Sequence, residues 1–329
     1  TIYGGTWDGI TAIANGSDTV DYGEIIDTSY NIFADLSGNT NNVEIRTGTT
    51  VIKADNVINV NNAIGTSGND IFRGNSFANT LNGLGGNNTA LYTITALTAG
   101  IVADLQAGEV TKTTASGTVK DTLINIQNLV GSNYDDYFVT KITENNIIDG
   151  GAHGVIGDTI DYSTNGATKI ILDLDVTHTT DFYGIGAIND GEYANAYIGN
   201  GTFVDKIKNI ENIKGSAGAD TIYGNSENNT IFGMGGNDTI YGVAGNNYID
   251  GGAGNDLIYS GTEADTLFGG TGNDTFRGTT TALSFAGDVI DGGNETDGIN
   301  VTGRGSDTVD YSLVDTSSFS KGLELTLND

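Results

Sequence analysis

The chain has 329 residues, among them 50 Gly but no Pro and no Cys, and it carries 42 acidic residues against 13 basic ones. The lack of Cys excludes a disulfide framework and a cysteine-based zinc site, and the acidic balance excludes nucleic acid as a partner. No apolar run is long enough to span a membrane, so we expect no membrane insertion. Most of the acids are Asp, which is typical of turns, and abundant glycine favours a fold with many tight turns.

A long module repeats along the chain. Its opening motif, Ser17–Tyr22 with the sequence SDTVDY, returns at 157–162 and 306–311 and, in a worn form, at 87–92. An alternating strand run follows each copy. In the full modules an Asn-rich strand comes next, of which Ile58–Asn62 is the first, and then glycine-rich turns. A repeat of this length is typical of solenoid architectures.

The module divides the chain into five predicted segments. They are the tail of a preceding repeat at 1–16, a first module at 17–86, a degenerate module at 87–156, a module with the main roll at 157–304, and the start of a fourth module at 305–329. The degenerate module has lost most of its turn glycines, so we expect it to be rich in strands but poor in metal. Because both ends fall inside a module, we expect the chain to be a fragment of a longer array.

Seven nonapeptides follow one another without a gap from Gly215 to Arg277. Their shared pattern is Gly-Gly-x-Gly-x-Asp-x-U-x, in which U is a large apolar residue, and Gly251–Tyr259 and Gly269–Arg277 match it at every defined position. Glycine at positions 1, 2 and 4 allows the left-handed backbone that a Cβ would penalise. Each nonapeptide therefore predicts a turn of six residues followed by a strand of three.

This pattern resembles the hemolysin-type calcium-binding repeat of the RTX family. The resemblance implies an all-β fold, a right-handed parallel β-roll, whereas the period alone supports only a right-handed β-solenoid. Two nonapeptides would complete one coil of 18 residues, and the strands of successive coils would pair about 4.8 Å apart. The U residues are then expected to point inward and stack as a core: Ile222, Ile231, Ile240, Ile249, Ile258, Leu267 and Phe276.

Alternate turns of such a roll stack on the same edge. On one edge the residues at position 6 are Asp220, Asp238, Asp256 and Asp274. Neighbouring carboxylates about 5 Å apart would repel each other by roughly 3 kcal/mol at an effective dielectric constant of 20. Ca²⁺ between them turns repulsion into coordination, because it binds about six to eight oxygens and accepts the carbonyls that a glycine turn exposes. Several Ca²⁺ ions are therefore the expected cofactors.

The resemblance also implies which atoms bind each ion. In RTX rolls one turn gives the carbonyls of positions 2 and 4 and the carboxylate of position 6, and the next turn on that edge gives the carbonyls of positions 1 and 3 and its own carboxylate. The three sites so implied are Ser216, Gly218, Asp220, Gly233, Gly235 and Asp238; then Met234, Gly236, Asp238, Gly251, Ala253 and Asp256; then Gly252, Gly254, Asp256, Gly269, Thr271 and Asp274. A weaker site in the first module would use Thr66, Gly68 and Asp70 with Gly83, Gly85 and Asn88.

The opposite edge of the roll has Asn229, Asn247 and Asp265 at position 6. Asparagine side chains can stack as a hydrogen-bonded amide ladder that needs no ion. Both a metal-free ladder and a weak calcium site remain open for this edge, and Asp265 is its candidate carboxylate ligand. The prediction is an asymmetric roll in which one edge is well occupied by calcium.

The sequence carries no motif of enzyme chemistry. Its two histidines form no His-x-x-x-His motif, and it has no Gly-x-Ser-x-Gly elbow, phosphate loop or Cys nucleophile. We expect a non-enzymatic, calcium-dependent structural region of a secreted bacterial surface protein, such as an S-layer subunit, an adhesin or an extracellular filament. The alternative is the C-terminal RTX region of a secreted protease, lipase or epimerase whose catalytic domain lies outside this chain. The resemblance implies type I secretion, and the expected partners are calcium, copies of the chain and the cell surface.

Overall fold

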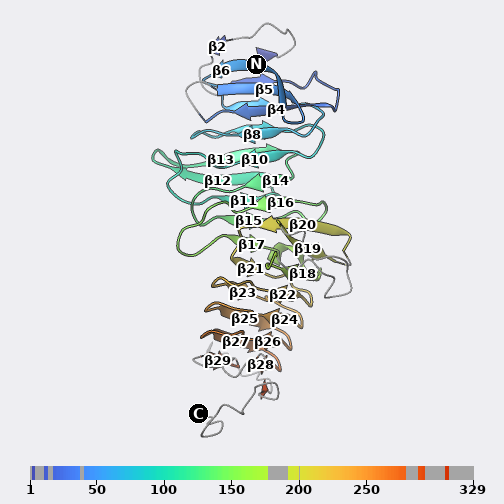
Figure 1. Ribbon diagram of the computed structural model, residues 1–329, viewed down its shortest axis with the longest axis vertical. Coiled ribbons are helices and arrows are strands. Elements are labelled where there is room, and N and C mark those ends of the chain that lie inside the picture. Colours follow the sequence, from blue (N-terminus) through green and yellow to red (C-terminus); the bar gives the residue numbers. More distant parts are fainter. Residues whose placement is uncertain are drawn as a thin grey trace. The chain divides into compact units, whose positions relative to one another are not determined.

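The computed structural model describes residues 2–3, 11–13, 18–37, 41–176, 192–199, 201–278, 288–292 and 308–310. The chain divides into two compact units, of which the first comprises 1–160 and 203–210 and the second comprises 161–202 and 211–329. Both units consist of β-strands (Figure 1), and the one helical element among the described residues is a short 3-10 turn at Ser163–Asn165. The predicted all-β fold class is confirmed.

The first unit contains two sheets. In strand order, one sheet consists of β1 (Ile2–Tyr3), β3 (Thr19–Asp21), β7 (Asn62–Ile64), β9 (Thr80–Asn82), β13 (Gly117–Ile124), β12 (Glu109–Thr114), β11 (Val102–Asp104), β15 (Tyr137–Val139) and β17 (Thr159–Asp161). The other consists of β2 (Thr11–Ile13), β6 (Thr50–Ile58), β5 (Asn41–Thr47), β4 (Tyr30–Asp35), β8 (Ile71–Arg73), β10 (Thr89–Leu91), β14 (Asn128–Val130), β16 (Ile147–Asp149) and β20 (Phe203–Lys208).

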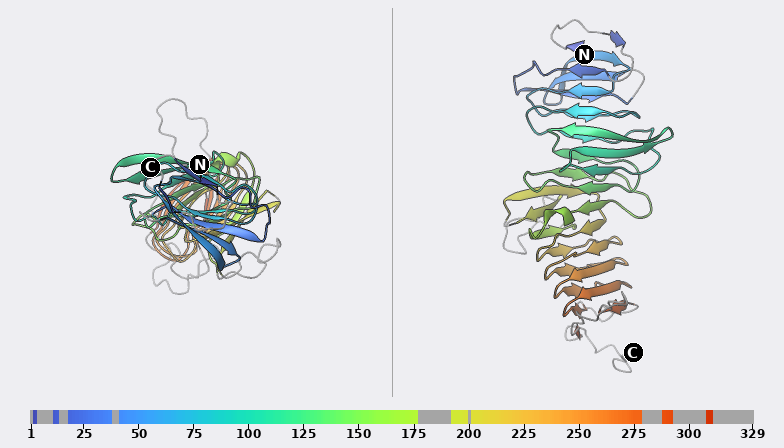
Figure 2. Two further views of the ribbon diagram at one scale, coloured as in Figure 1. Left: turned by 90° about the horizontal axis from the view of Figure 1, so that it is seen from above. Right: turned by 180° about the vertical axis from the view of Figure 1, so that it is seen from behind.

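The second unit continues the same design with shorter strands. One sheet consists of β21 (Asn212–Lys214), β23 (Thr230–Phe232), β25 (Tyr248–Ala253), β27 (Thr266–Thr271) and β29 (Val289–Asp291). The other consists of β19 (Ala194–Ile198), β18 (Ile170–Asp173), β22 (Thr221–Tyr223), β24 (Thr239–Tyr241), β26 (Leu257–Tyr259), β28 (Thr275–Arg277) and β30 (Thr308–Asp310). Figure 2 shows the stacked strands of each unit from two further directions.

The nonapeptide region is a parallel roll with a coil of 18 residues. Ile222 pairs with Ile240 and Ile240 with Ile258 in one sheet, while Ile231 pairs with Ile249 in the other, always in parallel register. Alternate repeats therefore stack directly on each other, as predicted, and turns two repeats apart share an edge.

The U residues form the core of this roll. All seven, from Ile222 to Phe276, are at most 1% exposed. Each side chain buried in this way stabilises the fold by about 1.5–3 kcal/mol, and the next coil repeats the contact. The predicted inward stacking is confirmed.

The structure adds antiparallel strands that the repeat pattern does not predict. In the first unit β4, β5 and β6 pair antiparallel, as do β11, β12 and β13, and in the second unit β18 pairs antiparallel with β19. Two of these hairpins turn at a glycine with positive φ, Gly48 (+60°) and Gly117 (+118°), a conformation that disfavours any residue with a Cβ. The alternating runs β4, β11 and β18 therefore stay in the parallel coil, and each begins an antiparallel excursion through the strand that follows it.

The Asn-rich segments are corners and not continuous strands. β6 ends at Ile58 and β7 begins at Asn62, with Asn59 between them at φ +58°. Asn125 and Asn209 occupy the same left-handed region at +52° and +53°. Asn is one of the few residues with a Cβ that adopt this conformation readily, because its short polar side chain can hydrogen-bond locally. Asparagine here sets where the coil bends.

Candidate calcium sites

On the edge that carries Asp220 to Asp274, position 1 is glycine in every turn, and two oxygens crowd its α-carbon. A Cβ built at Gly251 would lie 2.4 Å from Asp256 Oδ2 and 2.7 Å from the carbonyl oxygen of Gly269, which opens the next turn on that edge. The same holds one coil earlier, where a Cβ at Gly233 would lie 2.5 Å from Asp238 Oδ2 and 2.4 Å from Gly251 O. A carboxylate oxygen of one turn and a carbonyl oxygen of the next therefore converge beside this glycine.

One oxygen of each position-6 carboxylate joins successive coils. The N–H of Asp220 donates to Asp238 Oδ1 at 2.7 Å, that of Asp238 donates to Asp256 Oδ1 at 2.8 Å, and that of Asp256 donates to Asp274 Oδ1 at 2.8 Å. All four side chains are only 1–2% exposed. A buried N–H needs an acceptor, and this ladder supplies one in every coil.

The other carboxylate oxygen, Oδ2, is placed to bind a cation. The Oδ2 atoms of Asp238 and Asp256 are buried and accept no hydrogen bond from the described residues. Desolvation raises the pKa of Asp238 to about 8 and that of Asp256 to about 7, and nearby aspartates add to both shifts. An ionised carboxylate in this place is costly unless a positive charge compensates it. Ca²⁺ fits this requirement, since it is a hard cation that binds carboxylate and carbonyl oxygens together.

On the opposite edge, amide groups fill the equivalent space. Asn247 Oδ1 accepts from the Asn229 N–H at 2.9 Å, which continues the ladder, while Asn247 Nδ2 donates to the carbonyls of Gly242 (3.2 Å) and Ala244 (3.1 Å) in its own turn. Asn229 Nδ2 donates to Glu211 O at 2.8 Å. The amide nitrogen of Asn247 thus stands where the aspartate edge has an oxygen without a donor, whereas in the Asn229 turn the amide oxygen takes this place and accepts from the Asn225 N–H at 2.9 Å; both turns are complete without an ion.

At its C-terminal end the Asn edge has a carboxylate, that of Asp265, in place of an amide. Asp265 Oδ1 accepts from the Asn247 N–H at 2.8 Å, and the Asp265 N–H donates to Asp288 Oδ1 at 2.9 Å. The Oδ2 atom of Asp265 accepts no hydrogen bond from the described residues, and desolvation raises the pKa of this carboxyl to about 7. Asp265, the candidate ligand of this edge, therefore resembles Asp238 and Asp256 in its environment.

A hydroxyl at position 2 distinguishes the first turn of each repeat run. Ser216 donates through both N–H and Oγ to the carboxylate of Asp220, at 2.7 and 2.9 Å. Thr66 does the same to Asp70, at 2.6 Å from its N–H and 3.0 Å from its Oγ1. Both oxygens of these aspartates are already hydrogen-bonded, so they need a cation less than Asp238 does.

The predicted carbonyl ligands differ in how far they are engaged. Those of Met234, Ala253 and Thr271 accept backbone hydrogen bonds from the adjacent coil at 2.8–3.0 Å, and that of Ser216 accepts one at 3.3 Å. In the first module, Asn88 Nδ2 donates to the Gly85 carbonyl at 2.8 Å. The position-1 carbonyls are the ones placed beside the carboxylates.

The remaining predicted ligands lie in these same stacked turns, before β8 and β10 in the first module and before β22, β24, β26 and β28 in the roll. They are Gly68, Gly83, Gly218, Gly235, Gly236, Gly252 and Gly254.

Sequence reasoning missed several carboxylates that continue the ladder. Asp158 Oδ1 accepts from the Asp136 N–H at 2.7 Å, and Asp205 Oδ1 accepts from the Asn146 N–H at 2.9 Å. Asp288 follows Asp265 after 23 residues, so a search at the period of 18 does not find it. A signal was present in Asp288-Val289-Ile290, which repeats the Asp-x-U of the nonapeptide.

Two further searches concern the described residues only. No three or more His, Cys, Asp or Glu side chains gather there as a metal-binding group, and no helix there has the length and apolar character needed to cross a membrane.

Comparison with known proteins identifies the repeats. A family model described as the RTX calcium-binding nonapeptide repeat matches the chain in four copies, at residues 64–90, 210–240 and 241–276. None of the curated proteins matches the chain. The matched residues include Asp70 and the aspartates of the roll, and they cover the turns described above. The resemblance read from the sequence is confirmed: these segments are RTX calcium-binding repeats, which bind several Ca²⁺ ions and occur in secreted proteins.

Proposed function

We propose that this chain is a calcium-dependent structural region of a secreted bacterial surface protein, such as an S-layer subunit, an adhesin or an extracellular filament, with no catalytic role of its own. One observation supports it above all others. The second carboxylate oxygens of Asp238 and Asp256 are buried, have no hydrogen-bond donor among the described residues, and face the carbonyl that opens the next turn.

Calcium between stacked turns would couple binding to folding. The separated turns of an unfolded chain hold no preformed site, so the free energy of binding becomes free energy of folding. A net charge of −29 opposes compaction until cations neutralise part of it. Extracellular calcium-binding modules have dissociation constants on the order of 10⁻⁴–10⁻³ M. The roll would therefore be weakly stable where calcium is scarce and would complete its folding outside the cell.

The contacts of the carboxylates support an order of affinity among the proposed sites. The ions held by Asp238 and Asp256 should bind most tightly, because the second oxygen of each carboxylate accepts no hydrogen bond from the described residues. The ion that uses Asp220 competes with Ser216 for the carboxylate, and the first-module site competes with Thr66 and with the amide of Asn88. The site at Asp265 is the proposed exception on the Asn edge.

Circular dichroism tests the calcium requirement directly. We expect the full chain in excess EGTA to lack part of its far-UV β spectrum, and we expect millimolar Ca²⁺, but not equal Mg²⁺, to restore it. Mg²⁺ is the matched control because it demands near-octahedral geometry and dehydrates reluctantly. A complete β spectrum in EGTA that calcium leaves unchanged would contradict the proposal.

Assembly is the part of the proposal that concerns the cell surface. A parallel solenoid presents unpaired strand edges at the ends of its coils, and calcium can bridge acidic surfaces of neighbouring copies. We expect light scattering to show calcium-dependent growth in particle mass. A chain that stays monomeric throughout a calcium titration would remove the assembly role and leave the calcium-dependent fold in place.

A further inference from the structure

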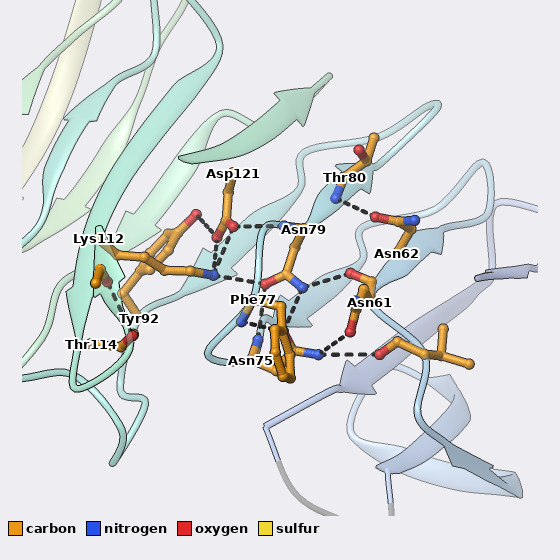
Figure 3. A network of polar contacts seen from close by, with 12 residues as sticks. Asn61, Asn62, Asn75, Phe77, Asn79, Thr80, Tyr92, Lys112, Thr114 and Asp121 are labelled. Carbon is orange, nitrogen blue, oxygen red and sulfur yellow. Dashed lines mark hydrogen bonds and ion pairs between the residues drawn. The ribbon is translucent and has the colours of Figure 1, made fainter. Parts of the chain in front are cut away.

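The first unit buries a lysine beside a turn that is built like the turns of Asp238 and Asp256, the proposed calcium turns. Lys112 lies in β12 of the antiparallel excursion, and its side chain is 0% exposed, as is that of Asp121 in β13. Its Nζ lies 2.7 Å from both carboxylate oxygens of Asp121 and 2.8 Å from Asn79 Oδ1 (Figure 3). Tyr92, also fully buried, donates its hydroxyl to Asp121 Oδ2 at 3.1 Å.

Asp121 occupies a position-6 place although no nonapeptide surrounds it. β9 and β13 pair in parallel with Thr80 opposite Thr122, so Asn79 and Asp121 belong to successive coils on one edge. The Asn79 N–H donates to Asp121 Oδ1 at 2.8 Å, the same contact that links Asp220 to Asp238.

The second unit contains the same turn with an amide in this place. Asn75 and Asn79 match Asn225 and Asn229: in each pair the later Nδ2 donates to the earlier Oδ1, at 2.8 and 3.2 Å. The residue that follows on the edge is Asn247 in the second unit, and its Nδ2 satisfies turn carbonyls. In the first unit it is Asp121, which has no such nitrogen and brings a negative charge instead.

Lys112 supplies the missing charge from the place beside the position-1 glycine. A Cβ at Gly74 would lie 2.4 Å from Asn79 Oδ1 and 3.6 Å from Asp121 Oδ2, and both oxygens contact the ammonium. In the calcium turns, the corresponding place beside Gly233 is lined by Asp238 Oδ2 and Gly251 O. Burial lowers the pKa of Lys112 and raises that of Asp121, and the charge of each partner opposes the shift of the other.

We propose that Lys112 is a built-in cation, covalently tethered to the fold, which performs at Asn79 and Asp121 the role that calcium has between the aspartate turns of the second unit. The comparison with calcium rests on the function proposed above. This coil of the first unit is then closed without metal, and the two units differ in their need for calcium. The excursion through β12 brings the lysine into the turn.

Hydrogen exchange on the full chain, read by mass spectrometry, tests the proposal. In excess EGTA we expect residues 74–82 and 117–124 of the wild type to be protected. In Lys112→Met they should exchange faster by about a hundredfold or more, because an uncompensated carboxylate is left buried. The matched control is Lys120→Met in the same hairpin, where the lysine is 63% exposed and pairs with Glu109, and protection should be unchanged. Adding Asp121→Asn to Lys112→Met removes the stranded charge and should restore most of the protection.

Three results would overturn the built-in cation. They are protection of 74–82 and 117–124 in the wild type only after calcium is added, equal exchange in the Lys112 and Lys120 variants, and no recovery in the double variant. The same experiment tests the proposed calcium role separately, at residues 215–277. That role would be contradicted if these residues were protected in EGTA and their exchange did not change when Ca²⁺ was added. That result would leave the comparison of the Lys112 and Lys120 variants intact.

Discussion

Replacing Asp256 by Asn tests why the two edges of the roll differ. The amide keeps the shape of the side chain, and its Oδ1 can still accept the hydrogen bond that the Asp238 N–H donates to Asp256 Oδ1 at 2.8 Å in the wild type. Its Nδ2 replaces an oxygen without a donor and can bond turn carbonyls, as Asn247 Nδ2 bonds those of Gly242 and Ala244. We expect Asp256→Asn to be more stable than the wild type without calcium and less stable with it.

The magnitudes follow from the burial of the carboxylate. Burial raises the pKa of Asp256 from 3.8 to about 7, so ionising it above pH 8 costs up to about 4 kcal/mol at about 1.4 kcal/mol per pH unit. Solvent screening reduces this, and we expect a gain of about 2 kcal/mol in EGTA. At about 10 mM Ca²⁺, a site with a dissociation constant of about 0.1–1 mM contributes about 1.4–2.7 kcal/mol. Asp256 belongs to two proposed sites, so the variant should lose about 3–5 kcal/mol of calcium stabilisation.

Urea unfolding followed by circular dichroism at pH 8, in EGTA and in calcium, measures both effects. The reverse exchange, Asn247→Asp, is the matched control on the opposite edge. It should destabilise the calcium-free chain by about 2 kcal/mol and increase its response to calcium, because a buried carboxylate replaces a satisfied amide. The reasoning is refuted if Asp256→Asn destabilises the calcium-free chain as much as Asp256→Ala does, or if Asn247→Asp has no effect in EGTA.

Three further predictions follow from the same turns. Burial raises the pKa of Asp238 to about 8 in the folded chain, so without calcium the folded state binds more protons than the unfolded one. The stability that protonated Asp238 contributes is complete below about pH 4 and is lost as the pH rises through 8. The urea midpoint in EGTA should thus be higher at pH 5 than at pH 9, and a midpoint that rises with pH would argue against ionised, uncompensated carboxylates. Ser216→Gly removes a hydroxyl donor from Asp220, so it should cost about 1 kcal/mol in EGTA and strengthen calcium binding in calorimetry; unchanged binding would mean that the hydroxyl does not compete with the ion. Met234→Gly relieves a φ of +75° at a side chain that is 43% exposed and keeps the carbonyl, so it should raise stability by about 1 kcal/mol, and a lower melting temperature would contradict this.

The repeat predicts the parts of the fold that depend on local spacing. The period of nine places Ile222 and Ile240 in register and buries them, because each strand has one inward position and the coil length is constant. The same period places Asp238 and Asp256 on one edge. The sequence also marks the turns in which a hydroxyl contacts the position-6 aspartate, since Thr66 and Ser216 both follow the first glycine of a run.

Features that break the period could not be predicted in this way. Lys112 reaches Asp121 through an antiparallel hairpin, and the pairing that brings Asp121 beside Asn79 spans 42 residues instead of 18. The left-handed corner at Asn59 resembles a strand residue in sequence, because it lies between alternating apolar positions. Long-range geometry decides these places, and the residue pattern alone does not encode it.

The ladder of Oδ1 contacts gives the roll a chemical direction. In each step the N–H belongs to the earlier coil and the carboxylate or amide oxygen to the later one, as between Asp238 and Asp256 or between Asn229 and Asn247. A hydrogen bond to a charged group is worth about 1.5–3 kcal/mol, so a coil gains much of its cohesion from the coil that comes after it in the sequence. Along this ladder the two faces of a coil are consequently unlike, one offering side-chain oxygens as acceptors and the other backbone N–H groups as donors. This ladder continues between coils of separate molecules only when they stack head to tail, and such a contact propagates as a polar fibre and not as a closed pair.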